Sequence, residues 1–224
     1  MEDGKKMINI IYEDNHILVV EKPINMPVCE DESKDQDLLN HLKKYLKKKY
    51  NKPGNVYLAL IHRLDRPVGG IMVFAKTSKA ASRLNNQIKQ KKINKKYYAV
   101  LCGELKENGK LVDKLYKDTK TNMVTVNELG KESILEYTII KIKNNLTLTD
   151  IKLVTGRPHQ IRVQFSSRGY PLYGDQRYNK NSIPKQQIAL YSYYLSFTHP
   201  TTKEILEFKC DLPKRYPFTE FIDT

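Results

Sequence analysis

The stretch ILEYTIIKIKNNLTLTDIKLV, residues 134–154, carries the pattern that decides the fold class. Apolar residues in its second half mostly alternate with polar ones, which is the period of a strand with one buried face. These apolar residues are Leu146, Leu148, Ile151 and Leu153. Asn144 and Asn145 separate the two runs and suit the tight turn of a hairpin. The stretch therefore predicts two antiparallel strands joined by a turn.

Further strands are predicted on both sides of this hairpin. Short apolar runs bounded by turn residues are typical of strands. Such runs occupy residues 8–12, 16–23, 71–75, 97–105, 123–126, 189–197 and 205–210. Because neighbouring runs look paired as hairpins, we expect a mainly antiparallel arrangement.

Three segments follow a helical period instead. Apolar residues recur at helical spacing between Leu38 and Leu46, with lysines filling the rest of the surface. A second helix is predicted to begin at Ser78. The third is predicted within residues 155–169, where Pro158 suits a first turn. Strands outnumber helices, so we predict an α+β fold, a mixed, mainly antiparallel sheet with flanking helices. No long linker or internal repeat divides the chain, so one domain over residues 1–224 is expected.

Composition favours an anionic partner. The chain has 39 Lys and Arg against 25 Asp and Glu, a net charge of +14. Lysine and arginine neutralise phosphates, so this excess raises the expectation of nucleic acid or an anionic surface. Much of it gathers in two runs, residues 43–52 and 89–96. A protein binding DNA or a membrane surface would explain the charge equally well, but only the charge supports that interpretation.

Several protein classes are excluded by what the sequence lacks. The longest strongly apolar stretches, such as residues 71–75, fall far short of the ~20 residues that a spanning helix needs. Met1 is followed by charged residues rather than an apolar segment, so we expect a cytoplasmic protein without a secretory signal. Cys29, Cys102 and Cys210 show no metal-ligand spacing, which indicates reduced, structural thiols.

Two polar clusters interrupt apolar surroundings and are the candidate sites. The first, ALIHRLDRPVGGIMVFAK at residues 59–76, contains Asp65 just before a turn rich in proline and glycine. An aspartate there can simply cap backbone amides, or form a surface ion pair. The second, LVTGRPHQIRVQF at residues 153–165, contains Arg157, His159 and Arg162. A carboxylate that stays ionised in a partly apolar cleft needs a fixed cation, and Arg162 could supply it.

The two clusters carry a resemblance to a known family. HRLDRPVGGIMVFAKT, residues 62–77, resembles the HRLDxxTSGLLLFAKT signature of the RluA-type RNA pseudouridine synthases. TGRPHQIRVQFSSRGYPLYGDQRY, residues 155–178, resembles their TGRTHQIRVHLxxxGHPIxGDxxYG signature. Residues 12–28, 95–105 and the closing hairpin are similar to further family motifs, so the resemblance covers nearly the whole chain in order. It implies the pseudouridine-synthase fold with a central active-site cleft, without an N-terminal S4 domain.

The resemblance also implies roles for individual residues. Asp65 matches the catalytic aspartate, and Tyr97 matches the tyrosine that stacks on the target base. Arg162 matches the basic partner of the aspartate, and Arg63 matches the arginine that fills the gap left by the flipped uridine. The residues expected to contact RNA are Arg63, Arg66, Arg157, His159, Lys89, Lys92 and Lys96.

The implied reaction is the isomerisation of uridine in RNA without a cofactor or metal. The N1–C1′ bond breaks, the uracil rotates, and a C5–C1′ bond forms. Asp65 would act either as nucleophile at C1′ or as base at the ribose, and both roles stay open. The uridine must first leave its stack, which suits an inserted arginine beside an aromatic platform. We expect an RNA substrate, ribosomal RNA ahead of transfer RNA, no membrane partner, and a monomer.

Three residues depart from the family pattern. Val68 and Gly69 stand where the family has Thr and Ser, and Tyr170 stands where it has His. The two lost hydroxyls motivate an alternative hypothesis, a catalytically weak or inactive RNA-binding assembly factor on the same scaffold.

Overall fold

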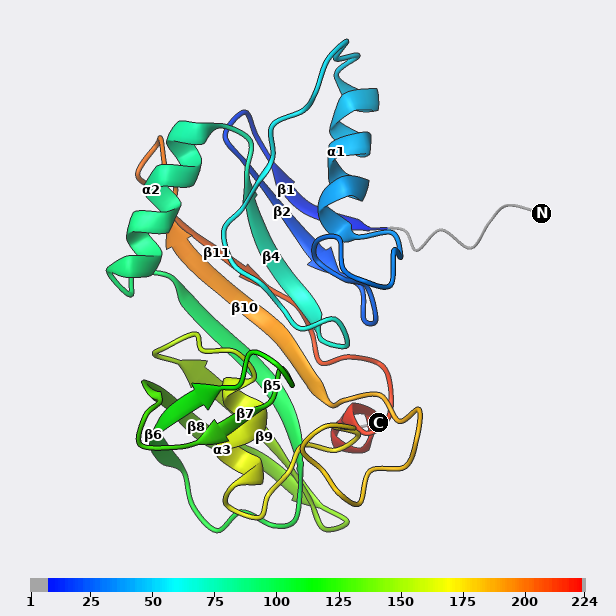
Figure 1. Cartoon of the computed structure of the whole chain (residues 1–224), viewed down its shortest axis with the longest axis vertical. Coiled ribbons are helices and arrows are strands. Elements are labelled where there is room, and N and C mark those ends of the chain that lie inside the picture. The colour runs from blue at the N-terminus through cyan, green and yellow to red at the C-terminus, as the bar shows by residue number, and fades with distance from the viewer. Residues whose placement is uncertain (1–7, 223–224) are drawn as a thin grey trace, which may run out of the picture. The chain divides into compact units, whose positions relative to one another are not determined.

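The computed structural model describes residues 8–222, which form two compact units (Figure 1). Of these residues, unit 1 comprises 8–93 and 195–210, and unit 2 comprises 94–194 and 211–222. The α+β fold with a mainly antiparallel sheet is confirmed, because eleven strands accompany three α-helices and one 3-10 helix in the described chain. The expected single domain and its central cleft stay predictions.

Unit 1 is built around a strand that is buried along its whole length. That strand is β4 (Gly69–Ala75). The other elements of unit 1 are β1 (Asn9–Glu13), β2 (Ile17–Lys22), α1 (Leu38–Lys49), β3 (Ala59–Leu60), α2 (Ser78–Lys89), the end of β10 (Leu190–Thr198) and β11 (Ile205–Lys209). The strand β2 pairs antiparallel with both β1 and β4, and β3 also pairs antiparallel with β4. All seven residues of β4 are buried. Its apolar side chains therefore form the centre of the unit 1 core.

Local signals place the helices of unit 1 where the sequence predicts them. The side chain of Asp37 accepts a hydrogen bond from the Asn40 N–H at the start of α1, at 2.9 Å. Thr77 Oγ1 accepts one from the Ala80 N–H, so α2 begins at Ser78 as predicted. Both caps satisfy N–H groups that a helix start would otherwise leave unpaired.

Unit 2 contains the hairpin that the opening stretch predicts. Its elements are β5 (Asn94–Cys102), β6 (Gly109–Lys117), β7 (Val124–Val126), β8 (Lys131–Lys143), β9 (Leu146–Leu153), α3 (Gln160–Ser166), the start of β10, and the 3-10 helix η1 (Phe218–Phe221). Strands β8 and β9 pair antiparallel, and both turn residues between them, Asn144 and Asn145, have positive φ. Antiparallel pairing continues from β9 to β5 and from β8 through β6 to β7.

The third helix is shorter than the segment in which it is expected. Residues 155–159 form a loop, and α3 covers only Gln160–Ser166. The expectation that Pro158 lies in the first turn is therefore wrong. His159 has a left-handed backbone, φ 51°, which no helix interior allows. Gln160 Oε1 accepts hydrogen bonds from Thr155 Oγ1 and the Arg157 N–H, and these bonds fold the loop before the helix starts.

One buried carboxylate ties three elements of unit 1 together. Glu13, at the end of β1, accepts four hydrogen bonds between 2.6 and 3.0 Å. The donors lie in α1, just after it, and just after β4: Tyr45, Lys49, Tyr50 and Lys76. Burial by itself would raise the pKa of Glu13, but these donors outweigh it and lower the pKa to about 2. The ionised carboxylate is therefore part of the folded structure.

No helix among residues 8–222 is both long and apolar enough to cross a membrane.

We expect Glu13→Gln to lower the free energy of unfolding by about 1–3 kcal/mol at pH 7, because it weakens four hydrogen bonds to a carboxylate whose side chain is only 6% exposed. The pKa of Glu13 is depressed in the folded protein, so its stabilisation is complete above its ordinary value of 4.5 and disappears as the pH falls towards about 2. Denaturant unfolding of both proteins at pH 7 and pH 2.5 measures this. The exposed Glu128→Gln is the control, and an undiminished Glu13→Gln effect at pH 2.5 would contradict the prediction.

Candidate active site

Asp65 lies in unit 1, in the connection between β3 and β4. Its carbonyl oxygen accepts a hydrogen bond from the Val68 N–H at 2.9 Å, which closes a four-residue turn just before β4 begins. The Asp65 residue is half-buried, whereas its neighbours Leu64 and Val68 are buried. The turn therefore presents the carboxylate from a segment that is anchored in the core on both sides.

The buried side chain of Lys22 is hydrogen-bonded to the same turn. Lys22 ends β2 and is only 1% exposed. Its Nζ donates hydrogen bonds to the carbonyl oxygens of Pro23, Met26 and Arg66, at 2.9, 2.7 and 3.0 Å. A buried ammonium is costly unless its donors are satisfied. Lys22 therefore connects the end of β2 to the residue that follows Asp65.

The departures Val68 and Gly69 are accommodated by the main chain. Val68 is 2% exposed, so its side chain fills the core, and Gly69 is the first residue of β4. The turn is closed by a backbone hydrogen bond and by Lys22, neither of which needs a hydroxyl at these positions. The third departure, Tyr170, lies against Gly103, where an added Cβ would be 3.2 Å from the ring.

The two arginines beside Asp65 are exposed and have different neighbours. Arg63 Nη2 is 2.7 Å from the sulfur of Cys29. Arg66 forms ion pairs with Asp31 and Asp35 of the preceding loop. The charge of Arg66 is therefore partly compensated by carboxylates, whereas Arg63 contacts a thiol.

In unit 2, Tyr97 and Tyr98 take opposite faces of β5, as alternation along a strand requires. Tyr97 is 5% exposed and lies opposite Ile151 of β9. Tyr98 is half-buried and stacks on Tyr193, with ring centroids 3.7 Å apart and planes 9° from parallel. The two tyrosines therefore have separate environments.

Arg162 projects from α3 into a buried ion pair. Its Nε and Nη2 donate to the two carboxylate oxygens of Asp175 at 2.8 and 2.7 Å. The side chains are 7% and 0% exposed. The Arg162 guanidinium also lies 5.1 Å from the centre of the Tyr178 ring. This bidentate geometry fixes the plane of the guanidinium as well as its position.

The loop before α3 carries the two other predicted contacts of this cluster. Arg157 is exposed and its Nε donates to the Glu132 carbonyl oxygen at 3.1 Å. His159 Nδ1 is 2.7 Å from the hydroxyl of Tyr178, so it is linked to the same tyrosine as Arg162. Arg162 and His159 are thus brought together through Tyr178.

The three lysines predicted to contact RNA differ in their surroundings. Lys89 ends α2 and Lys92 follows it, and both are exposed in unit 1. Lys96 lies in unit 2, where its Nζ is 3.5 Å from Asp150 and 5.7 Å from the centre of the Tyr194 ring. Lys89 and Lys92 are therefore more accessible to an RNA phosphate than Lys96 is.

The predicted site residues fall into two groups, one in each unit. Asp65, Arg63, Arg66, Lys89 and Lys92 belong to unit 1. Unit 2 carries Tyr97, Arg162, Arg157, His159 and Lys96. The predicted pairing of Asp65 with Arg162 stays a prediction, and Asp175 is the partner that unit 2 itself provides.

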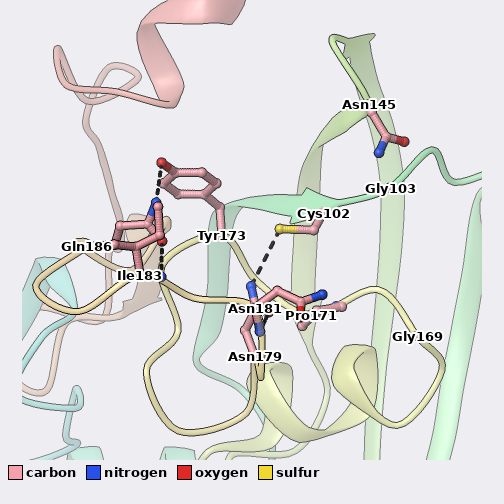
Figure 2. Close-up of a pocket in the computed structure, with 10 residues that line it drawn as sticks. All are labelled: Cys102, Gly103, Asn145, Gly169, Pro171, Tyr173, Asn179, Asn181, Ile183 and Gln186. Carbon is pink, nitrogen blue, oxygen red and sulfur yellow. Dashed lines mark hydrogen bonds between the residues drawn. The ribbon is translucent and has the colours of Figure 1, made fainter.

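A cavity of about 330 Å³ opens at the other end of β5, and no predicted site residue lines it (Figure 2). Cys102 lies in its wall, 3.6 Å from Asn179 Nδ2, and burial raises the pKa of the thiol. Gln186, which also lines the cavity, donates to the Tyr173 hydroxyl at 2.8 Å. No group of three or more His, Cys, Asp or Glu in the described part of the chain is arranged to hold a metal ion.

Sequence reasoning missed Lys22 and Asp175. Asp175 stands within the quoted motif GDQRY, so its motif was a usable signal for the arginine partner. Lys22 lies in a segment whose pattern predicts only a strand, and its partner Arg66 is 44 residues away. No pattern of neighbouring residues predicts that contact.

The chain is similar to known RNA-modifying proteins over most of its length. Residues 16–167 match the family described as RNA pseudouridylate synthase. The chain is 34% identical to an uncharacterized RNA pseudouridine synthase of Aquifex aeolicus, over 93% of this chain and 71% of that protein. It is 33% identical to ribosomal large subunit pseudouridine synthase C of Buchnera aphidicola, over 87% and 64%. It is 31% identical to ribosomal large subunit pseudouridine synthase D of Pasteurella multocida, over 96% and 69%.

A solved structure shows the same fold. Human RNA pseudouridylate synthase domain containing 4 superimposes with a TM-score of 0.79, covering 95% of this chain and 92% of that one, at 18% identity. At this identity the match supports the fold and does not by itself assign residues.

We expect Asp175→Asn to lower the free energy of unfolding by about 3 kcal/mol, because it leaves the Arg162 guanidinium buried without a charge partner. Glu136→Gln, which removes the exposed ion pair with Lys152, should cost less than about 1 kcal/mol. Denaturant unfolding of the three proteins measures the difference. An equal loss of unfolding free energy in both variants would show that the buried pair stabilises the fold no more than the exposed one.

Proposed function

This chain belongs to the RNA pseudouridylate synthase family, and from that premise we propose that it isomerises specific uridines of ribosomal RNA. It is an RNA pseudouridine synthase, an isomerase. The ribosomal substrate is supported by the printed names of its relatives, the ribosomal large subunit pseudouridine synthases C and D. The net charge of +14 suits a large RNA. Transfer RNA stays the second expected substrate.

The observation that carries the assignment of Asp65 is the anchoring of its turn. A carboxylate is ionised at neutral pH, so a catalytic aspartate needs positioning more than activation. The Asp65–Val68 hydrogen bond and the Lys22 contact to Arg66 supply that positioning. Asp65 then acts on the ribose of the target uridine, either by attack at C1′ or as a base.

Tyr97 is proposed to stack on the uracil, and Arg162 is proposed to stabilise the negative charge of Asp65. In this proposal the ring of Tyr97, fixed within β5, stacks on the extruded uracil. Arg162 keeps the aspartate ionised while the glycosidic bond breaks and re-forms. Its bidentate bond to Asp175, through Nε and Nη2, fixes the position and plane of the guanidinium for that role.

Arg63 is proposed to occupy the place of the flipped uridine in the RNA helix. It is exposed, and its guanidinium rests against the Cys29 sulfur rather than a carboxylate. Leaving this weak acceptor costs less than breaking an ion pair such as those of Arg66. Arg63 is therefore the arginine of this loop that can move into RNA most easily.

The alternative function, an inactive RNA-binding assembly factor, rested on the hydroxyls missing at Val68 and Gly69. Since the Asp65 turn is closed by main-chain contacts, nothing in the described loop favours that alternative. Action in the cytoplasm, as a monomer and without metal or cofactor, stays part of the proposal.

Asp65→Asn should abolish pseudouridine formation, with a loss of at least about 1,000-fold, because the neutral amide can act neither as nucleophile nor as base. Pseudouridine-specific chemical mapping of cellular RNA from cells with each variant locates the modified sites. Glu128→Gln, an exposed carboxylate outside the site, is the matched control. Modification of the same sites by Asp65→Asn would show that the assignment of Asp65 is wrong.

Arg63→Ala should slow modification of structured RNA about tenfold or more, but slow a short single-stranded substrate much less. The single-stranded RNA needs no unstacking from a helix, so it gains little from an inserted side chain. Single-turnover rates on the two substrates measure the ratio. Equal losses on both would count against insertion of Arg63.

A further inference from the structure

Lys95 lies on the same face of β5 as Tyr97, two residues before it. Successive residues of a strand are about 3.3 Å apart, so the two Cα atoms are about 7 Å apart. Lys95 belongs to the lysine-rich run 89–96, in which Lys89, Lys92 and Lys96 are predicted to contact RNA. Its surroundings differ from those of the exposed lysines Lys89 and Lys92 in that run, because its side chain is partly buried.

The Lys95 ammonium rests against the loop that leads to α3. A Cβ added at Gly156 would lie 3.2 Å from Lys95 Nζ, so the absence of a side chain at this position leaves space for the ammonium. Gly156 precedes Arg157, the exposed arginine of the same loop. The ammonium therefore sits between the strand of Tyr97 and a loop that carries a second cation.

Lys95 has no charge partner among the residues that the structure describes. Among residues 8–222 its Nζ makes no hydrogen bond or ion pair, whereas Lys22, Lys76 and Lys96 all have oxygen partners. Burial lowers the pKa of Lys95, and no carboxylate contributes to counter it. Since a partly buried cation is costly when it is unpaired, an external anion would satisfy it.

We propose that Lys95 binds the RNA phosphate adjacent to the uridine that stacks on Tyr97. The proposal rests on the proposed function, because it takes Tyr97 as the platform for the base. A lysine binds phosphate as a point charge, and phosphate contacts fix the register of RNA rather than its sequence. Lys95 is thus an RNA-binding residue that sets which nucleotide reaches Tyr97.

The first test removes the charge from each partner in turn. Lys95→Met is combined with an RNA fragment around a mapped site, made with a neutral methylphosphonate at the phosphate on the 5′ or the 3′ side of the target. On the RNA fragment without a methylphosphonate, Lys95→Met should raise KM about tenfold and change kcat less than threefold. At one of the two positions the methylphosphonate should weaken binding of the wild type by a similar factor, with no further loss in Lys95→Met. Independent, additive losses at both positions would overturn the proposal.

Two further measurements separate binding from a structural role. Lys95→Met removes an uncompensated charge, so its Tm should be unchanged or higher, and a clear fall in Tm would indicate a structural lysine. Lys95→Arg keeps the charge and should restore most of the affinity, which also covers the case in which the methionine variant folds poorly. Lys152→Met, at an exposed lysine paired with Glu136, is the matched control.

The salt dependence of RNA binding tests Lys95 even without catalysis. Removing one phosphate contact should reduce the slope of log K against log salt by about 0.7–0.9. If the wild type formed no pseudouridine in any RNA, the proposed function would fail, while an altered slope in Lys95→Met would still support the phosphate contact. An unchanged slope beside an active wild type would overturn the Lys95 proposal alone.

Discussion

The buried ion pair between Arg162 and Asp175 is the interaction on which the described part of unit 2 most depends. Besides the guanidinium, Asp175 Oδ1 accepts the N–H groups of Arg177 and Tyr178, so the pair fixes the segment after it. Tyr178 in turn contacts His159 and accepts a hydrogen bond from the Val124 N–H. The start of α3 and the start of β7 are therefore held through one carboxylate.

The cationic side chains of the chain lie in three kinds of environment. Arg162 and Lys22 are buried and donate hydrogen bonds to oxygen atoms of the protein. The lysines on the outer surface, such as Lys89, are exposed to solvent. Lys95 combines partial burial with the lack of an oxygen partner within residues 8–222. Net charge alone does not distinguish these states, although only some of them leave a cation available to an anionic ligand.

The parts of the fold that the sequence predicts are those set by neighbours along the chain. The turn at Asn144 and Asn145 and the helix start at Ser78 depend on backbone preferences and capping within a few residues. The motif predicts that Asp65 precedes a turn and then a strand, and the structure has a turn that begins at Asp65 and leads into β4.

The parts that the sequence does not predict depend on distant contacts. The burial of Lys22 depends on a carbonyl 44 residues away, and a lysine at the end of a strand usually reaches solvent. The left-handed backbone of His159 shortens α3, although the residues themselves follow a helical period. That conformation accompanies the contact with Tyr178, 19 residues further on.

The hydrogen bonds that hold the Asp65 turn, from the Val68 N–H and from Lys22, all end on main-chain carbonyl oxygens, and this affects how the site can diverge. Backbone groups are the same whatever the side chain, so positions 68 and 69 can exchange hydroxyls for apolar or small residues while the path of the chain is retained. What limits substitution there is the volume available in the core around β4. A hydroxyl missing from a signature at these two positions is therefore weak grounds for classing a sequence as a pseudoenzyme.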